Sequence, residues 1–209
     1  MNILVDWGNT IIRDADLFKQ IAEKSGNVKT EWENPSSWNR VRSLGDNNHF
    51  DSIQDGFFLI GDSYPGAIEV ISSFCGKCPE EDHVYIIFDN VPIIKKELDK
   101  IQIYLAESFQ RRNVLANGFI VESNKIFAAK SYGINVAVDD DPRIAISLCL
   151  AGIKTIVPLR KWNRNLSLNL LEITMKEDKF NIVKENLIIA EDWYEIGIIL
   201  GTLSDSQSG

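Results

Sequence analysis

The sequence of 209 residues is short of cysteine, of basic residues and of long apolar runs. Its 3 cysteines fit a reducing compartment and exclude a disulfide-stapled scaffold. Acidic residues (30) outnumber basic ones (22), and the net charge of -8 is the opposite of the basic surface that nucleic acids select. We therefore expect no nucleic-acid polymer as a partner.

The apolar runs are too short to span a bilayer, and the first residues lack the basic start and cleavage site of a signal peptide. These features predict a cytoplasmic protein without a membrane partner, and they give no indication of the oligomeric state. Cys75 and Cys78 form a CxxC, but no second ligand pair has zinc spacing, and a helical rather than an extended segment precedes it. We interpret these cysteines as the end of a helix.

What the sequence does contain is a series of short apolar runs rich in branched residues. The first run ends at Asp6, and the later runs cover residues 84–88, 118–121, 134–138, 154–158 and 187–190. Helical patterns lie between most of them, which predicts an α/β fold with a Rossmann-like, doubly wound parallel sheet. A final helix is expected from Asp192, with fraying after Leu203.

The segment after the first run is too polar for a buried strand. Residues 15–69 include helical spacing and several aromatic side chains, which suits a lid over a ligand. We expect a small helical cap at 15–69, inserted into a core made of residues 1–14 and 70–209.

Acidic residues follow three of the predicted strands. Asp6 ends the first strand, Asp89 ends the second, and the run at 139–141 ends the fourth. Because the carboxyl ends of parallel strands meet at one edge of a sheet, these acids are expected to lie together. Clustered carboxylates repel one another unless a cation lies among them, and such oxygen ligands suit Mg2+. The alternative is that the acids only cap the turns and helices that follow.

These residues resemble the motifs of the haloacid dehalogenase (HAD) superfamily. The similarity rests on DWGNT around Asp6, a lysine within residues 125–130, and VDDDP at 138–142. Within that superfamily the chain is similar to the 5'(3')-deoxyribonucleotidases. The segments that match this family in order are DGFF (55–58), YPGA (64–67), VESNK (121–125), WN (162–163) and EDW (191–193).

The resemblance implies a phosphohydrolase that acts on a nucleoside monophosphate or another small phosphate ester. Asp6 would be the nucleophile and would carry the phosphoryl group as an aspartyl-phosphate. Mg2+ would be held by Asp6, the carbonyl of Gly8, and Asp139 or Asp140.

The resemblance also implies a lysine that neutralises the phosphate and the nucleophile. Lys125 matches the family in its upstream context, and Lys130 matches in its distance to the acids, so both remain candidates. The residues expected to contact the substrate are Thr10, Phe57, Phe58 and Asn90.

Two residues depart from the family pattern. Gly8 stands where the family has a second aspartate that protonates the leaving alcohol, and Asp89 stands where a Thr or Ser is usual. General acid catalysis is typically worth about 10²–10⁴-fold, so we expect slow hydrolysis unless a protonated Asp89 replaces the missing donor.

Two alternatives therefore remain open. The first is a catalytically impaired HAD-fold protein that binds a ligand or a partner. The second is a phosphonatase-like hydrolase, because DWGNT is also similar to the DWAGT of phosphonoacetaldehyde hydrolases, which likewise lack the second acid.

Overall fold

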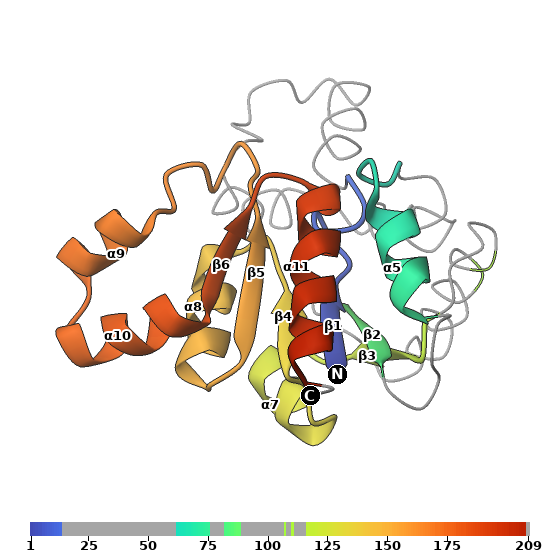
Figure 1. Cartoon of the computed structure of the whole chain (residues 1–209), viewed down its shortest axis with the longest axis horizontal. Coiled ribbons are helices and arrows are strands. Elements are labelled where there is room, and N and C mark those ends of the chain that lie inside the picture. Colours follow the sequence, from blue (N-terminus) through green and yellow to red (C-terminus); the bar gives the residue numbers. More distant parts are fainter. Residues whose placement is uncertain (14–61, 76–81, 89–106, 108–109, 111–115, 208–209) are drawn as a thin grey trace, which may run out of the picture.

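The protein is built on one open sheet of parallel strands (Figure 1). A computed structural model describes residues 1–13, 62–75, 82–88, 107, 110 and 116–207. In these residues the strand order is β3-β2-β1-β4-β5-β6, the order of a doubly wound Rossmann-like sheet. The strands are β1 (Asn2–Asp6), β2 (His83–Phe88), β3 (Gly118–Val121), β4 (Val136–Val138), β5 (Lys154–Pro158) and β6 (Leu187–Ala190). The predicted fold class is confirmed.

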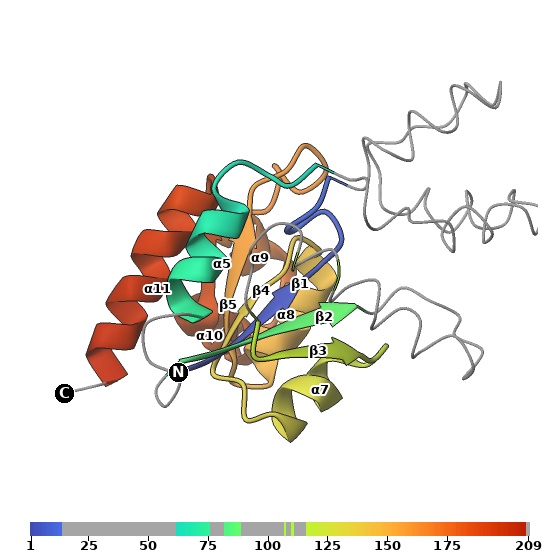
Figure 2. The ribbon, with the colours of Figure 1, turned by 90° about the vertical axis from the view of Figure 1, so that its right-hand side faces the viewer.

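Helices cover both faces of this sheet. Helices α5 and α11 lie against one face, and α7 and α8 lie against the other (Figure 2). The helices are α5 (Ala67–Cys75), α7 (Lys125–Ser131), α8 (Pro142–Leu150), α9 (Leu168–Thr174), α10 (Glu177–Asn186) and α11 (Trp193–Gln207). No helix in the described part of the chain combines the length and the apolar character needed to cross a membrane.

The central strand β1 shows why both faces are covered. Ile3 and Val5 belong to the apolar cluster that includes α5 and α11, whereas Leu4 belongs to the cluster that includes α7 and α8. All three side chains are 1% exposed. Successive side chains of a strand point to opposite faces, so an unbroken apolar run requires packing on both sides.

The carboxyl-terminal third of the chain contains helices that the apolar pattern does not indicate. In α10 only Phe180 and Val183 are buried, because the helix packs mainly against α8 and α9 and its other residues face away from the core. The last helix runs to Gln207 and does not fray after Leu203, contrary to our expectation. The Ser204 hydroxyl donates to Asp82 Oδ2 (3.0 Å) and ties this part of α11 to the residue that precedes β2.

The predicted cap falls mostly outside the described residues. Of the range 15–69, only residues 62–69 are described, and Ala67 at the start of α5 is fully buried in the core. The division into a cap at residues 15–69 and a core therefore stays a prediction.

Candidate metal and catalytic site

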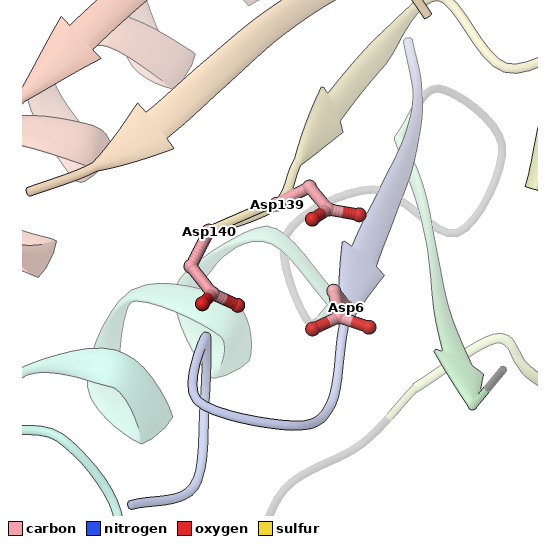
Figure 3. Close-up of side chains that lie close together, drawn as sticks. All are labelled: Asp6, Asp139 and Asp140. Carbon is pink, nitrogen blue, oxygen red and sulfur yellow. The ribbon is translucent and has the colours of Figure 1, made fainter. Parts of the chain in front are cut away.

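The candidate site lies where the central strands β1 and β4 end. Val5 pairs with Val138, so Asp6, the last residue of β1, and Asp139, the first residue after β4, lie beside each other. Asp140 follows, and the three carboxylates lie close together (Figure 3). One oxygen from each of the three acids lies within 4.8 Å of the others, and all three residues are buried. Asp6, Asp139 and Asp140 therefore lie together at one edge of the sheet, as predicted, whereas Asp89, a further member of the predicted group, lies outside the described residues.

Lys125 connects two of these acids. Its Nζ lies 2.7 Å from Asp6 Oδ1 and 2.7 Å from Asp139 Oδ2. The lysine is the first residue of α7, and Asn124 caps that helix by accepting a hydrogen bond from the Phe127 N–H (3.0 Å). This cap starts the helix at the residue whose ammonium group meets the acids.

The third acid, Asp140, is held by neutral groups. The Thr10 hydroxyl lies 2.9 Å from Asp140 Oδ1 and 3.2 Å from Asp6 Oδ2, and it accepts a hydrogen bond from the Asp140 N–H (3.1 Å). Trp162 Nε1 donates to Asp140 Oδ2 (2.8 Å). Burial and the charge of Asp139 raise the pKa of Asp140 to about 7, although the hydrogen bonds from Thr10 and Trp162 and the charge of Lys125 act in the opposite direction.

The chemistry of this cluster is compatible with a divalent metal ion. When Asp6, Asp139 and Asp140 are all ionised, three negative charges lie close together, and the Lys125 ammonium group contacts two of them. A hard divalent cation bound by carboxylate oxygens would reduce the repulsion among them. Each carboxylate oxygen has two lone pairs, so the hydrogen bonds to Asp140 leave it able to bind a cation as well.

The structure separates the two candidate lysines. Lys125 is 5% exposed and contacts the acids, whereas Lys130 is exposed near the other end of α7 and is not brought to them. The distance along the chain from Lys130 to the acids matches the family better than that from Lys125. The position in the helix is what brings a lysine to the acids, however, and the first residue of α7 is the one that reaches the ends of β1 and β4.

The remaining predicted site residues have different outcomes. Thr10 is fully buried between Asp6 and Asp140, so its hydroxyl is engaged with acids. Gly8 lies in the loop after β1, where it forms a bridge with Ile12. The predicted positions outside the described residues are Phe57, Phe58, Asp89 and Asn90.

Several residues that hold the site were assigned no role from the sequence. The loop after β1 contains Asn9, which has a φ of 54°, a left-handed conformation that asparagine tolerates better than most residues. Its carbonyl accepts a hydrogen bond from Arg160 Nε (3.1 Å), and the Thr10 carbonyl accepts one from Trp193 Nε1 (2.9 Å). The available signal was position: Arg160 follows β5 and Trp193 follows β6, at the same edge of the sheet as the acids.

The fold and the site define an α/β protein of the Rossmann-like type with a buried cluster of acids and a lysine that can hold a metal ion. No protein-family model and no curated protein matches the chain. Among solved structures, the chain is similar to a hydrolase from Streptococcus pneumoniae (10% identity, 83% of this chain and 97% of that chain, TM-score 0.46).

Two further solved structures resemble the chain to a similar degree. One is a HAD-superfamily hydrolase, subfamily IA, variant 1, from Geobacter sulfurreducens (12% identity, 76% of this chain and 88% of that chain, TM-score 0.42). The other is a proposed beta-phosphoglucomutase from Thermotoga maritima (13% identity, 88% of this chain and 98% of that chain, TM-score 0.47). Likenesses of this size assign neither a family nor an activity. The fold rests on the strand order, and the chemistry rests on the acids and Lys125.

Proposed function

We propose that the protein is a Mg2+-dependent hydrolase of small phosphate esters, with nucleoside monophosphates as the first substrate class to test and Asp6 as the nucleophile. One observation carries this proposal: Asp6 ends the central strand with Oδ1 2.7 Å from Lys125 Nζ, inside a group of acid oxygens that lie within 4.8 Å of one another. The resemblance of DWGNT, the Lys125 segment and VDDDP to HAD motifs supports the same chemistry.

The chain's own residues supply most of what such a reaction needs. An incoming phosphate is an anion, and Lys125 places a positive charge between Asp6 and Asp139 that reduces their repulsion of it. Thr10 holds Asp6 against Asp140, which limits the movement of the attacking group. Bound Mg2+ would neutralise charge on the phosphoryl oxygens.

The proposed reaction has two steps. In the first, a carboxylate oxygen of Asp6 bonds to phosphorus, the bond from phosphorus to the ester oxygen breaks, and its electron pair leaves with the alcohol. In the second, water attacks phosphorus and gives a proton back to the group that protonated the alcohol, the bond from phosphorus to Asp6 breaks, and phosphate is released with the Asp6 carboxylate restored. The leaving alcohol needs a proton that Gly8 cannot supply, and we propose Asp89, outside the described residues, as the donor.

Hydrolysis of an aryl phosphate such as p-nitrophenyl phosphate in Mg2+ tests the role of Asp6. An aryloxide departs without a proton, so this substrate does not require the missing acid at position 8. We expect turnover by the wild type and loss of turnover to the background rate in Asp6→Asn. Asp141→Asn is the matched control, because Asp141 is adjacent to Asp140 in the chain but its carboxylate pairs with Arg143.

A second candidate function is a non-catalytic protein that binds a phosphorylated ligand. Gly8 favours it, because the position of the usual proton donor lacks any acidic group. Equal aryl phosphate turnover in the wild type and in Asp6→Asn, at the background rate, would reject the hydrolase and favour this function.

A further inference from the structure

The turn after β5 reaches the candidate site from the side opposite to Lys125. We call residues 160–163 the β5 turn; its side chains Arg160 and Asn163 are 8% and 2% exposed. Strand β5 pairs with β4, so this turn emerges beside Asp139 and Asp140 at the carboxyl edge of the sheet. A charged and a polar side chain buried here require partners in the site itself.

Arg160 holds the loop that follows Asp6. Its guanidinium donates from Nε to the Asn9 carbonyl (3.1 Å), from Nη2 to the Thr10 carbonyl (3.2 Å) and from Nη1 to the Leu159 carbonyl (3.0 Å). The ring of Tyr64 lies 3.6 Å from the guanidinium carbon. A planar fork with several donors can bind three carbonyls at once, which an ammonium group on a flexible chain cannot reproduce.

Trp162 and Asn163 hold the other side of the same site. Trp162 Nε1 donates to Asp140 Oδ2 (2.8 Å), and Asn163 Nδ2 donates to the Asp140 carbonyl (2.9 Å). The Asn163 side chain also accepts a hydrogen bond from the Arg160 N–H (2.6 Å), which joins the two halves of the turn. The β5 turn therefore contacts both the loop of Asp6 and the acid Asp140.

We propose that Arg160 and Trp162 are positioning residues that hold Asp6 and Asp140 in the arrangement that binds the cation; this inference rests on the proposed function. With Oδ1 bonded to Thr10 and Oδ2 bonded to Trp162, the Asp140 carboxylate is held at both oxygens and its plane is fixed. Partners that orient a metal-binding carboxylate typically contribute about 10- to 100-fold to metal affinity.

A purely structural role for the β5 turn makes a different prediction. In that case the variants would lower the melting temperature, and the folded protein would still bind the cation normally. Loss of cation affinity in a chain that remains folded is the property that separates positioning from general stabilisation.

Calorimetric titration of Mg2+ into the full-length metal-free protein tests the inference. Trp162→Phe keeps an aromatic ring and removes the N–H that bonds to Asp140. We expect it to lower Mg2+ affinity about 10- to 100-fold, with a melting temperature close to that of the wild type. Arg160→Lys keeps the charge and removes the fork, and we expect it also to weaken Mg2+ binding.

Val183→Ala provides a destabilised control away from the site. Val183 is fully buried in the cluster of α8, α9 and α10, so this variant should lower the melting temperature and leave Mg2+ affinity unchanged. Normal affinity in Trp162→Phe, or an equal loss of affinity in Val183→Ala, would overturn the inference alone. Absence of Mg2+ binding by the wild type would overturn the proposed function and the inference together.

Discussion

The two sides of the acid cluster stabilise buried carboxylates by different means. On the side of α7, Asp6 and Asp139 share the ammonium group of Lys125 at 2.7 Å each. On the side of the β5 turn, the hydrogen bonds to the Asp140 carboxylate come from two neutral groups, Thr10 and Trp162. Neutral donors fix the orientation of a carboxylate without cancelling its charge. Burial and the charge of Asp139 raise the pKa of Asp140 to about 7, and the hydrogen bonds from Thr10 and Trp162 oppose this rise without abolishing it.

This difference suggests that the two sides contribute differently to the stability and the orientation of the acids. On the α7 side the charged ammonium group of Lys125 contacts the acids, whereas on the β5 side neutral hydrogen-bond donors orient the Asp140 carboxylate. Three experiments can break or sharpen this contrast.

The largest effect is expected from Lys125→Met in metal-free buffer. Removal of one partner of a buried ion pair leaves an uncompensated charge and typically costs about 3–5 kcal/mol. Urea denaturation would measure the lost free energy of unfolding. Lys130→Met is the control on the same helix, and because Lys130 is exposed it should change stability by less than about 0.5 kcal/mol. Equal effects of the two variants would show that Lys125 compensates nothing.

A smaller effect is expected from pH, and it concerns Asp140. Its pKa is about 7 in the folded protein against an ordinary value of 3.8, so the folded chain binds more protons than the unfolded chain between these values. The free energy of unfolding should therefore fall as pH rises from about 4 to about 7 in metal-free buffer, and this contribution should vanish in Asp140→Asn. Mg2+ binds the ionised form, so its stabilising effect should grow over the same range.

The comparison of wild type with Asp140→Asn is essential because a neighbouring acid acts in the opposite direction. Burial acts to raise the pKa of Asp141, but the hydrogen bonds and charge of Arg143 outweigh it and hold that pKa below the ordinary value. This contribution is present above the ordinary range of an aspartate and is lost as the pH falls. If the free energy of unfolding changes with pH in the same way in the wild type and in Asp140→Asn between pH 4 and 7, the assignment to Asp140 is contradicted.

The smallest effect is expected from Arg143→Gln. Arg143 Nη2 lies 2.6 Å from Asp141 Oδ2, but the arginine side chain is 75% exposed, and exposed pairs contribute about 0.2–1 kcal/mol. Denaturation in 1 M salt should remove this difference and leave the effect of Lys125→Met nearly intact, since salt screens exposed charges far more than buried ones. Equal salt sensitivity of the two variants would mean that water reaches Lys125.

The fold was predictable from the sequence where burial on both faces leaves a continuous apolar run. All six observed strands coincide with such runs. Helices α9 and α10 were not predicted, because they pack against each other and α8 and bury few side chains, such as Leu171 and Phe180. Their apolar residues are too sparse to produce a clear helical period.

The site was predictable to the extent that it follows from strand ends. Asp6, Asp139 and Asp140 were expected together because parallel strands end at one edge. The choice between Lys125 and Lys130 was not available, because it depends on where Asn124 starts α7. The function of Arg160 was also hidden, since it bonds to Asn9, 151 positions away in the chain, and no local pattern marks such a contact.

The central position of β1 has a consequence for synthesis of the protein. Among the described residues this strand pairs with β2 and β4, and its second neighbour, Val136–Val138, is made more than a hundred residues later. Because synthesis proceeds at about 5–20 residues per second, an apolar edge of β1 stays unpaired on the ribosome for on the order of ten seconds or longer. The same central placement that gathers the acids thus exposes the nascent chain to edge-to-edge association, and a ribosome paused before β4 would lengthen that exposure.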